Sequence, residues 1–138
     1  MAVTVSTDAA RLDVDLIHDY ISTRSYWGQG RTRAEVERTI AASLCFGAYQ
    51  ADAFVGFCWV VTDRVTVAYV LDLFVLEAHR GQGVATRLVE AMLAHPELQT
   101  VVWYLSTRDA HRLYERYGFV ATAPNRLMTK PPIAIPLR

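Results

Sequence analysis

The sequence predicts one α/β domain, built on a mixed sheet of six or seven strands with about four helices around it. Three strand-like segments between residues 44 and 76 follow one another through short turns, which is typical of an antiparallel meander. A strand, an amphipathic helix and another strand then occupy residues 71–106, and such a connection makes the two strands parallel with a right-handed crossover. The chain has 138 residues, enough for one hydrophobic core, so we expect residues 1–138 to form a single domain.

The N-terminal segment predicts an edge strand followed by two helices. Val3 and Val5 alternate with polar neighbours, as in a strand with one buried face. Asp13 is placed to cap a short helix, and Thr32 and Glu35 form the T-x-x-E pattern that begins a second one. The loop between the two helices carries aromatic side chains that either line a pocket or cover the core: Tyr26 and Trp27.

Three segments of the central region predict the meander. Residues 44–49, 53–61 and 65–76 are mostly apolar and have strand length, while residues 50–52 and 62–64 carry turn residues. The two cysteines of the chain lie in these apolar segments, so we expect buried thiols rather than a disulfide or a metal site: Cys45 and Cys58.

The stretch from Leu71 to Leu93 carries the clearest functional pattern of the chain. An apolar strand runs into a glycine turn at residues 80–83, and the following helix repeats its apolar residues every three or four positions. The free N–H groups and the dipole at such a helix N-terminus favour a phosphate. Gly81 and Gly83 let the backbone approach that phosphate, and Arg80 adds a positive charge.

The same turn also has a plainer interpretation, in which the glycines serve only the geometry of a strand-to-helix connection. Thr86 occupies the position of the third glycine in the dinucleotide-binding fingerprint, and the chain has no P-loop pattern. Both of those nucleotide sites are therefore disfavoured.

The segment after the central helix predicts a buried strand and a further helix. Pro96 ends the central helix, and residues 100–106 read as the strand. Thr107 or Asp109 caps the next helix, and Gly118 supplies its left-handed end. The apolar face of this helix is made by Ala110, Leu113, Tyr114 and Tyr117.

The last part of the chain predicts a hairpin and a tail. We expect its two strands at residues 119–123 and 126–129. The apolar, proline-rich tail at residues 131–136 either packs back on the domain or joins a dimer contact.

The glycine turn resembles the acetyl-coenzyme-A signature of the GCN5-related N-acetyltransferase (GNAT) superfamily. That signature, Q/R-x-x-G-x-G/A, here reads RGQGVA from Arg80 to Ala85, and residues 74–76 match the strand that precedes it in the family. DAHRLYERYGF, from Asp109 to Phe119, resembles the family's A-x-x-x-Y-x-x-x-G-F helix. The resemblance implies the GNAT fold and binding of acetyl-CoA. It places pantetheine on the strand and the pyrophosphate on the turn: Phe74 and Val75 for the former, and Arg80, Gly81, Gln82, Gly83, Val84, Ala85 and Thr86 for the latter.

Two further observations qualify the resemblance. The segments SYW near residue 25 and LCFG near residue 45 are similar to a bacterial GNAT subgroup of undefined substrate. The family often has Asn three residues before the alanine of its last motif, where the side chain helps to hold pantetheine or a water molecule. Thr107 takes that place here and keeps a hydroxyl group, so we assign it to the cofactor site with different local hydrogen bonds.

Tyr114 is the candidate general acid. It occupies the tyrosine position of the last motif, where the resemblance implies a phenol close to the thioester sulfur. A thiolate leaving group benefits from such a proton donor. The alternative is a core tyrosine, because Tyr114 also lies on the apolar face of its helix. Tyr117 has the stronger pattern of a core residue.

Asp72 is the second catalytic candidate, because it is an acid inside an otherwise apolar strand. A buried carboxylate without a partner costs several kcal/mol, so this position requires either a partner or a role. The role is amine binding or proton removal through a water molecule, and the alternative is a salt bridge or a hydrogen bond to a loop. His79 and His111 are either proton relays or ordinary surface histidines.

Together these residues predict a cytoplasmic N-acetyltransferase that moves an acetyl group from acetyl-CoA to a primary amine of a small molecule or peptide. The formal net charge is zero, which disfavours nucleic-acid and membrane-surface partners, and no cluster has metal-ligand spacing. The apolar tail allows a homodimer. The alternative from another class is a non-catalytic acyl-CoA-binding sensor or interaction module. The acceptor amine, the general base and the oligomeric state are not specified by the sequence.

Overall fold

The computed structural model describes residues 2–24, 30–122 and 125–130. A single mixed sheet forms its centre. Its strands lie in the order β1-β2-β3-β4-β5. The pairs β1–β2, β2–β3 and β3–β4 are antiparallel, and the pair β4–β5 is parallel. The prediction of a meander followed by a parallel pair is thus confirmed. The strands are β1 (Val3–Ser6), β2 (Leu44–Gln50), β3 (Ala53–Thr62), β4 (Val67–Val75) and β5 (Val102–Tyr104).

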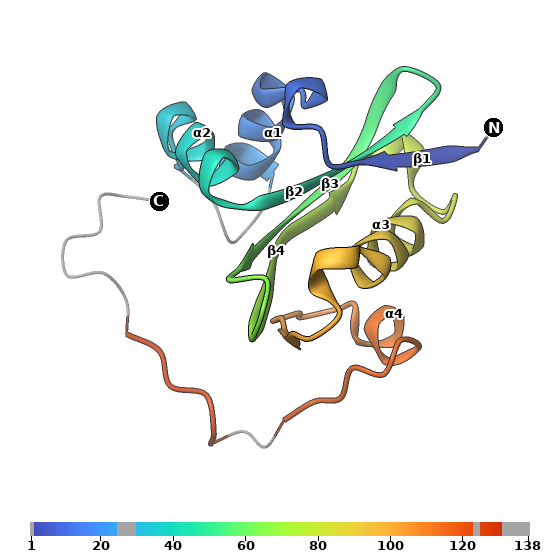
Figure 1. Cartoon of the computed structure of the whole chain (residues 1–138). Helices are drawn as coiled ribbons and strands as arrows, with labels where there is room; N and C mark the ends of the chain where they lie inside the picture. Colours follow the sequence, from blue (N-terminus) through green and yellow to red (C-terminus); the bar gives the residue numbers. More distant parts are fainter. Residues whose placement is uncertain (1, 25–29, 123–124, 131–138) are drawn as a thin grey trace.

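Four α-helices cover the two faces of this sheet. Figure 1 shows α1 and α2 on one face, and α3 with α4 on the other. A π-helical turn, Tyr20–Arg24, continues α1. The helices are α1 (Val14–Asp19), α2 (Arg33–Ala42), α3 (Val84–Ala94) and α4 (His111–Glu115), and short 3-10 turns lie at Ala9–Arg11, Glu77–His79 and Pro96–Leu98.

The predicted caps of the first two helices are present. The Asp13 carboxylate accepts a hydrogen bond from the Leu16 N–H at the start of α1. At α2 the Thr32 hydroxyl accepts from the Glu35 N–H, and the Glu35 carboxylate accepts from the Thr32 N–H. Both interactions of the capping box are therefore made, and they fix where the chain enters α2.

Each face of the sheet carries its own hydrophobic cluster. Leu88 and Met92 of α3 are fully buried against Val60 and Val70 of the sheet. On the opposite face the helices α1 and α2 bury a set of aromatic and aliphatic side chains: Leu12, Ile17, Tyr20, Ile21, Val36, Cys45, Phe57, Trp59 and Phe74. This alternation follows the two-residue period of the strands, which sends neighbouring side chains to opposite faces.

The prediction of a C-terminal hairpin is wrong, and the sheet has five strands among the described residues instead of the six or seven predicted. The described residues 119–122 and 125–130 form no strand. Val120 and Met128 are 82 % and 90 % exposed, so these side chains bury little apolar surface that would stabilise a hairpin. A two-stranded hairpin is marginal on its own, and Ala121 and Asn125 are poor strand formers.

The start of α4 also differs from the prediction. Ala110 is the N-cap residue and has no side-chain cap. The Thr107 hydroxyl instead accepts a hydrogen bond from the Ala110 N–H, one turn before the helix. The aromatic loop and the tail lie outside the described residues, so their predicted roles remain predictions: Tyr26, Trp27 and residues 131–136.

The thiols of Cys45 and Cys58 are free and buried, as predicted. Burial raises the pKa of Cys45 to about 12, and burial likewise raises the pKa of Cys58, so both thiols stay protonated near neutral pH. Among the described residues no helix combines the length and the apolar character needed to cross a membrane.

Candidate active site

A cleft opens where β4 and β5 separate. The two strands pair only between Val67–Tyr69 and Val102–Tyr104. Beyond this point β4 continues to Val75 and pairs only with β3. Beyond Tyr69, the side of β4 that faces away from β3 therefore has no strand partner among the described residues. Backbone groups left unpaired in this way are available to a ligand. The cleft has a volume of about 790 Å³, and its walls come from β4, the turn before α3, the N-terminal end of α3, the segment after β5 and α4.

The glycine turn forms one end of the cleft. Gly81 and Gly83 have φ angles of 76° and 80°, a left-handed conformation that glycine adopts without strain. Gly83 is the N-cap of α3, and the first helical hydrogen bond runs from the Arg87 N–H to the Gly83 carbonyl. The N–H groups of the first turn of α3 therefore have no helical acceptor: those of Val84, Ala85 and Thr86.

Space for an anion lies directly at this turn. A Cβ built on Gly81 or Gly83 meets no heavy atom within 4 Å, so the glycines are required by their φ angles and not by crowding inside the protein. Free N–H groups, the positive end of the helix dipole and open space together fit a pyrophosphate group.

Arg80 is held by the protein itself. Its Nε donates to the Val75 carbonyl at 3.2 Å, and its Nη2 donates to the Tyr20 hydroxyl at 2.7 Å. The Tyr20 ring stacks on Phe74 with centroids 4.1 Å apart and planes 9° apart. Arg80 thus ties the turn to β4 and to the π-helical turn after α1. Its charge lies beside the glycine turn, but these two bonds restrain the guanidinium group.

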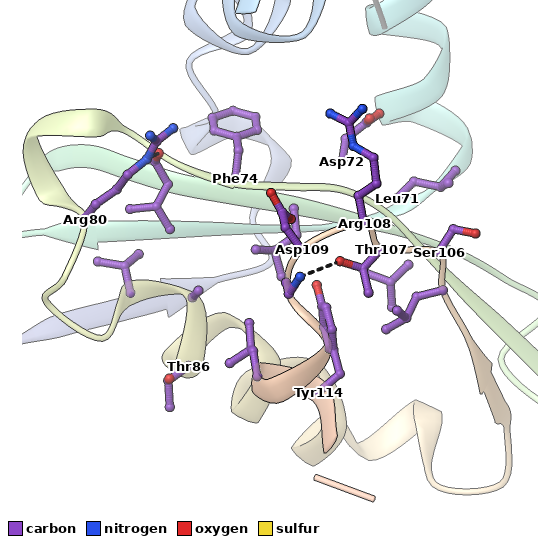
Figure 2. Close-up of a pocket in the computed structure, with 18 of the residues that line it drawn as sticks. Leu71, Asp72, Phe74, Arg80, Thr86, Ser106, Thr107, Arg108, Asp109 and Tyr114 are labelled. Carbon is purple, nitrogen blue, oxygen red and sulfur yellow. Dashed lines mark hydrogen bonds between the residues drawn. The ribbon is translucent and has the colours of Figure 1, made fainter. Parts of the chain in front are cut away.

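Phe74 and Val75 contribute main-chain atoms to the wall of the cleft. Both line it, and the Phe74 ring is buried in the cluster under α1 and α2. Figure 2 shows this ring pointing away from Tyr114. The strand therefore turns its main chain, not its aromatic side chain, toward a ligand lying between β4 and the segment after β5.

Tyr114 lies across the cleft from β4. It is 7 % exposed, and its ring contacts Phe119 edge to face at 5.6 Å between centroids. In Figure 2 its hydroxyl points toward the turn that the Thr107–Ala110 hydrogen bond closes. Burial, and to a lesser degree Cys58, raises the pKa of Tyr114. The phenol is therefore protonated throughout the physiological pH range. It has a proton to donate and does not serve as a base, while its raised pKa makes it a weaker acid than an exposed phenol.

Asp72 sits in a β-bulge of β4. Phe57 pairs with Phe74 and Trp59 with Leu71, so two residues of β4 oppose the single residue between them on β3. Asp72 has φ 51°, a conformation that Asp tolerates better than most residues. The bulge allows its side chain to turn toward α2.

The Asp72 carboxylate is paired with Arg31. Their side chains are 4 % and 19 % exposed, and Oδ2 lies 2.9 Å from Arg31 Nη1. Burial raises the pKa of Asp72, while the charge and the hydrogen bond of Arg31, with a smaller effect of Trp59, oppose that shift. The salt bridge that we gave as the alternative to a catalytic role is thus present.

The cleft brings together all but one of the predicted site residues. Gln82 is exposed and does not line it. His79 lines the cleft and His111 does not. The sequence analysis did not identify four other residues of this region: Tyr20, Arg31, Ser106 and Arg108. Of these four, only Arg31 could have been anticipated from the sequence, because the buried acid Asp72 on a strand requires a partner such as a cation. No cluster of potential metal ligands occurs among the described residues.

We predict that Gly83→Ala weakens binding at this turn. Alanine at φ 80° is disfavoured by roughly 1–2 kcal/mol, and relief of that strain rotates the N–H groups at the start of α3. The apparent melting temperature is expected to fall, and the thermal shift caused by CoA is expected to shrink. Gly118→Ala is the matched control, because Gly118 also has a positive φ of 93° but lies outside the cleft. It should lose stability alone, and an equal loss of the CoA shift would contradict the prediction.

The comparisons with known proteins concern this same part of the chain. A family model described as an acetyltransferase (GNAT) domain matches residues 41–121. A candidate acetyltransferase of Gibberella zeae, FG08082, is 30 % identical over 133 residues, which cover 80 % of this chain and 74 % of that protein. A candidate GNAT-family acetyltransferase from Xanthomonas campestris pv. campestris has a similar crystal structure, with 43 % identity and a TM-score of 0.91 over 95 % of this chain and 94 % of that one.

A more distant structure has the same fold. The ribosomal-protein-alanine N-acetyltransferase of Brucella melitensis biovar Abortus 2308 is 18 % identical, with a TM-score of 0.65 over 94 % of this chain and 100 % of that one. The family model covers more than half of the chain and includes both the glycine turn and Tyr114. The separation of β4 from β5 and the glycine turn agree with these matches. The chain belongs to the GNAT acetyltransferase family.

Proposed function

We propose that this chain transfers the acetyl group of acetyl-CoA to a primary amine, with both substrates bound at once. The observation that carries the proposal is the cleft, which joins a phosphate-binding turn to a protonated, buried tyrosine along an unpaired strand edge. A ligand with an anionic end and an extended amide-bearing arm fits such a site. Acetyl-CoA supplies the acetyl group as an activated thioester.

The residues of the turn and of β4 hold the two parts of the CoA. The N–H groups at the start of α3 bind the pyrophosphate, and Arg80 keeps the turn in place. Main-chain groups on the edge of β4 that faces away from β3, other than the Val75 carbonyl that Arg80 occupies, bond the amides of the pantetheine arm, as strand partners do in a sheet. Thr107 shapes the opposite wall through its hydrogen bond to Ala110.

Starting from its ammonium form, the amine nitrogen loses two protons overall: one passes to solvent before attack, and the other restores the proton that Tyr114 gives to sulfur. The amine nitrogen forms a bond to the acetyl carbon as the carbon–sulfur bond breaks, and the leaving thiolate takes a proton from Tyr114. An alkyl amine with a pKa of about 10.4 is neutral in roughly one molecule in a thousand near pH 7.4. The acceptor must therefore lose its proton on binding. Asp72 is the proposed group for handling the amine, directly or through water, and its pairing with Arg31 sets how basic the carboxylate is.

Release of the CoA thiol with a panel of amines tests this proposal. The panel contains polyamines, aromatic and aliphatic monoamines, amino acids and short peptides, and thermal shift with acetyl-CoA is measured in parallel. We expect a thermal shift together with thiol release on at least one amine class. A thermal shift without turnover on any amine would favour the acyl-CoA sensor. Absence of any shift would overturn the assignment of the glycine turn.

A further inference from the structure

Part of one face of the sheet carries apolar side chains that no described helix covers. Register places six side chains on the same face of β3, β4 and β5 as Trp59, because Val61 pairs with Tyr69, Tyr69 with Tyr104, and Val67 with Val102. We call these residues the open face: Val61, Val67, Tyr69, Leu71, Val102 and Tyr104. The helices α1 and α2 pack on the other half of this side of the sheet.

The open face is more exposed than apolar strand residues normally are. Val102 is 57 % exposed, Tyr104 is 47 % and Val61 is 45 %. Grouped apolar side chains on a surface mark a place where a ligand or a partner is bound, whereas single ones need no explanation.

This face is continuous with the cleft. Tyr69 and Leu71 belong to the open face and also line the cleft. They lie at the end of the cleft away from the glycine turn, because β4 runs from Val67 toward Val75 and the turn follows it. With the pyrophosphate on the turn and pantetheine along β4, the acceptor reaches the thioester from the side of Leu71.

The charge of the cleft as a whole does not favour a polycation. The described lining residues include two aspartates, Asp72 and Asp109, and three arginines. The carboxylate of Asp72 is already paired with Arg31 at 2.9 Å. A polyamine needs acidic groups to neutralise its second and third ammonium groups, and no acidic residue belongs to the open face.

We propose that the acceptor is a monoamine whose amino group is attached to an apolar or aromatic body. The amino group enters the cleft beside Asp72, and the body rests on Leu71, Tyr69 and Tyr104. This inference depends on the proposed acetyl transfer and names the acceptor class for it. It also gives a function to the exposed apolar side chains, which the binding of acetyl-CoA does not use.

The test compares amines with similar amino groups but different bodies. Thiol release is measured with phenethylamine, hexylamine, ethanolamine and putrescine, and we expect kcat/KM to be at least about tenfold higher for the two apolar amines, as one well-filled apolar contact provides. Leu71→Ser and Tyr104→Ser are expected to raise the KM for phenethylamine while leaving the thermal shift with acetyl-CoA unchanged. Val120→Ser is the control, because Val120 is 82 % exposed and lies outside the open face.

The outcomes separate this inference from the proposed function. Turnover that is highest with putrescine, or a KM unaffected by both serine variants, would overturn the inference but leave acetyl transfer standing. No turnover with any amine, together with no thermal shift, would overturn both. A further possibility is that the open face binds a second copy of the chain, and light scattering of the wild type and of Tyr104→Ser tests this. A wild-type dimer that becomes monomeric in Tyr104→Ser would assign the open face to the second copy and overturn the acceptor proposal.

Discussion

Tyr114→Phe is expected to lower kcat about a hundredfold, the contribution typical of a positioned general acid. The variant removes only the hydroxyl group, so the aromatic contact with Phe119 is kept. In the proposed function the turn and β4 hold acetyl-CoA, so its dissociation constant should change little. Steady-state thiol release and titration calorimetry with acetyl-CoA measure the two quantities separately.

The control for this variant is Tyr117→Phe. Tyr117 lies in the turn that follows α4, and its hydroxyl donates to the Glu90 carboxylate at 3.3 Å, outside the cleft. We expect its kcat to stay within about twofold of the wild type. An unchanged kcat in Tyr114→Phe would show that the phenol only fills the wall of the cleft and that the thiolate leaves without its proton.

The second large effect is expected from Arg31→Ala. This substitution leaves the Asp72 carboxylate buried without its counter-ion, and breaking a buried pair in this way typically destabilises a protein by about 3 kcal/mol. The free energy of unfolding, measured by urea titration at pH 8, should fall by roughly that amount. The loss applies to the folded chain and requires no assumption about the reaction.

The pH dependence of this variant has a definite sign. Burial raises the pKa of Asp72, and Arg31 opposes that rise, so the pKa is higher still when Arg31 is absent. Between the unfolded pKa of about 3.9 and the raised folded pKa, the native state binds more protons than the unfolded state. Stability therefore falls as the pH rises through this interval. We expect the deficit of Arg31→Ala to be smaller at pH 5 than at pH 8.

Asp72→Asn provides the matched control. Asn accepts the positive φ of this position, so the backbone of the bulge is retained, and the carboxylate charge is removed. The double variant Arg31→Ala/Asp72→Asn should recover most of the stability lost in Arg31→Ala, and it should lack the part of the pH dependence that Asp72 causes in this interval. If the double variant were as unstable as Arg31→Ala, packing of the arginine stem and not the uncompensated charge would explain the loss.

Local patterns of sequence predicted most of the fold and the geometry of the glycine turn. The capping box at Thr32, the period of α3 and the glycines of the turn each act over a few residues, and the structure has each of them. A strand followed by a helix and another strand also has a nearly fixed handedness. The parallel placement of β5 beside β4 therefore followed from the order of the elements.

Contacts between distant residues could not be predicted in the same way. Arg31 is 41 positions from Asp72, and Tyr20 is 60 positions from Arg80. No periodicity links residues so far apart, although the isolated acid on β4 showed that some partner was needed. The prediction of the hairpin was wrong because a local pattern typical of a strand does not supply the neighbouring strand that would stabilise it.

The short pairing of β4 with β5 has a consequence for local unfolding. Strand pairing joins β5 to the sheet only between Val67–Tyr69 and Val102–Tyr104 among the described residues, whereas β2 and β3 pair over most of their length. Amide hydrogens of β5 and α4 should therefore exchange with solvent through a low-energy opening, well before those of β3. A ligand that bridges the two separated strands takes the place of the missing pairing. Its binding free energy then appears as slower exchange in β5 and α4, so that occupancy of the cleft decides how rigid this side of the domain is.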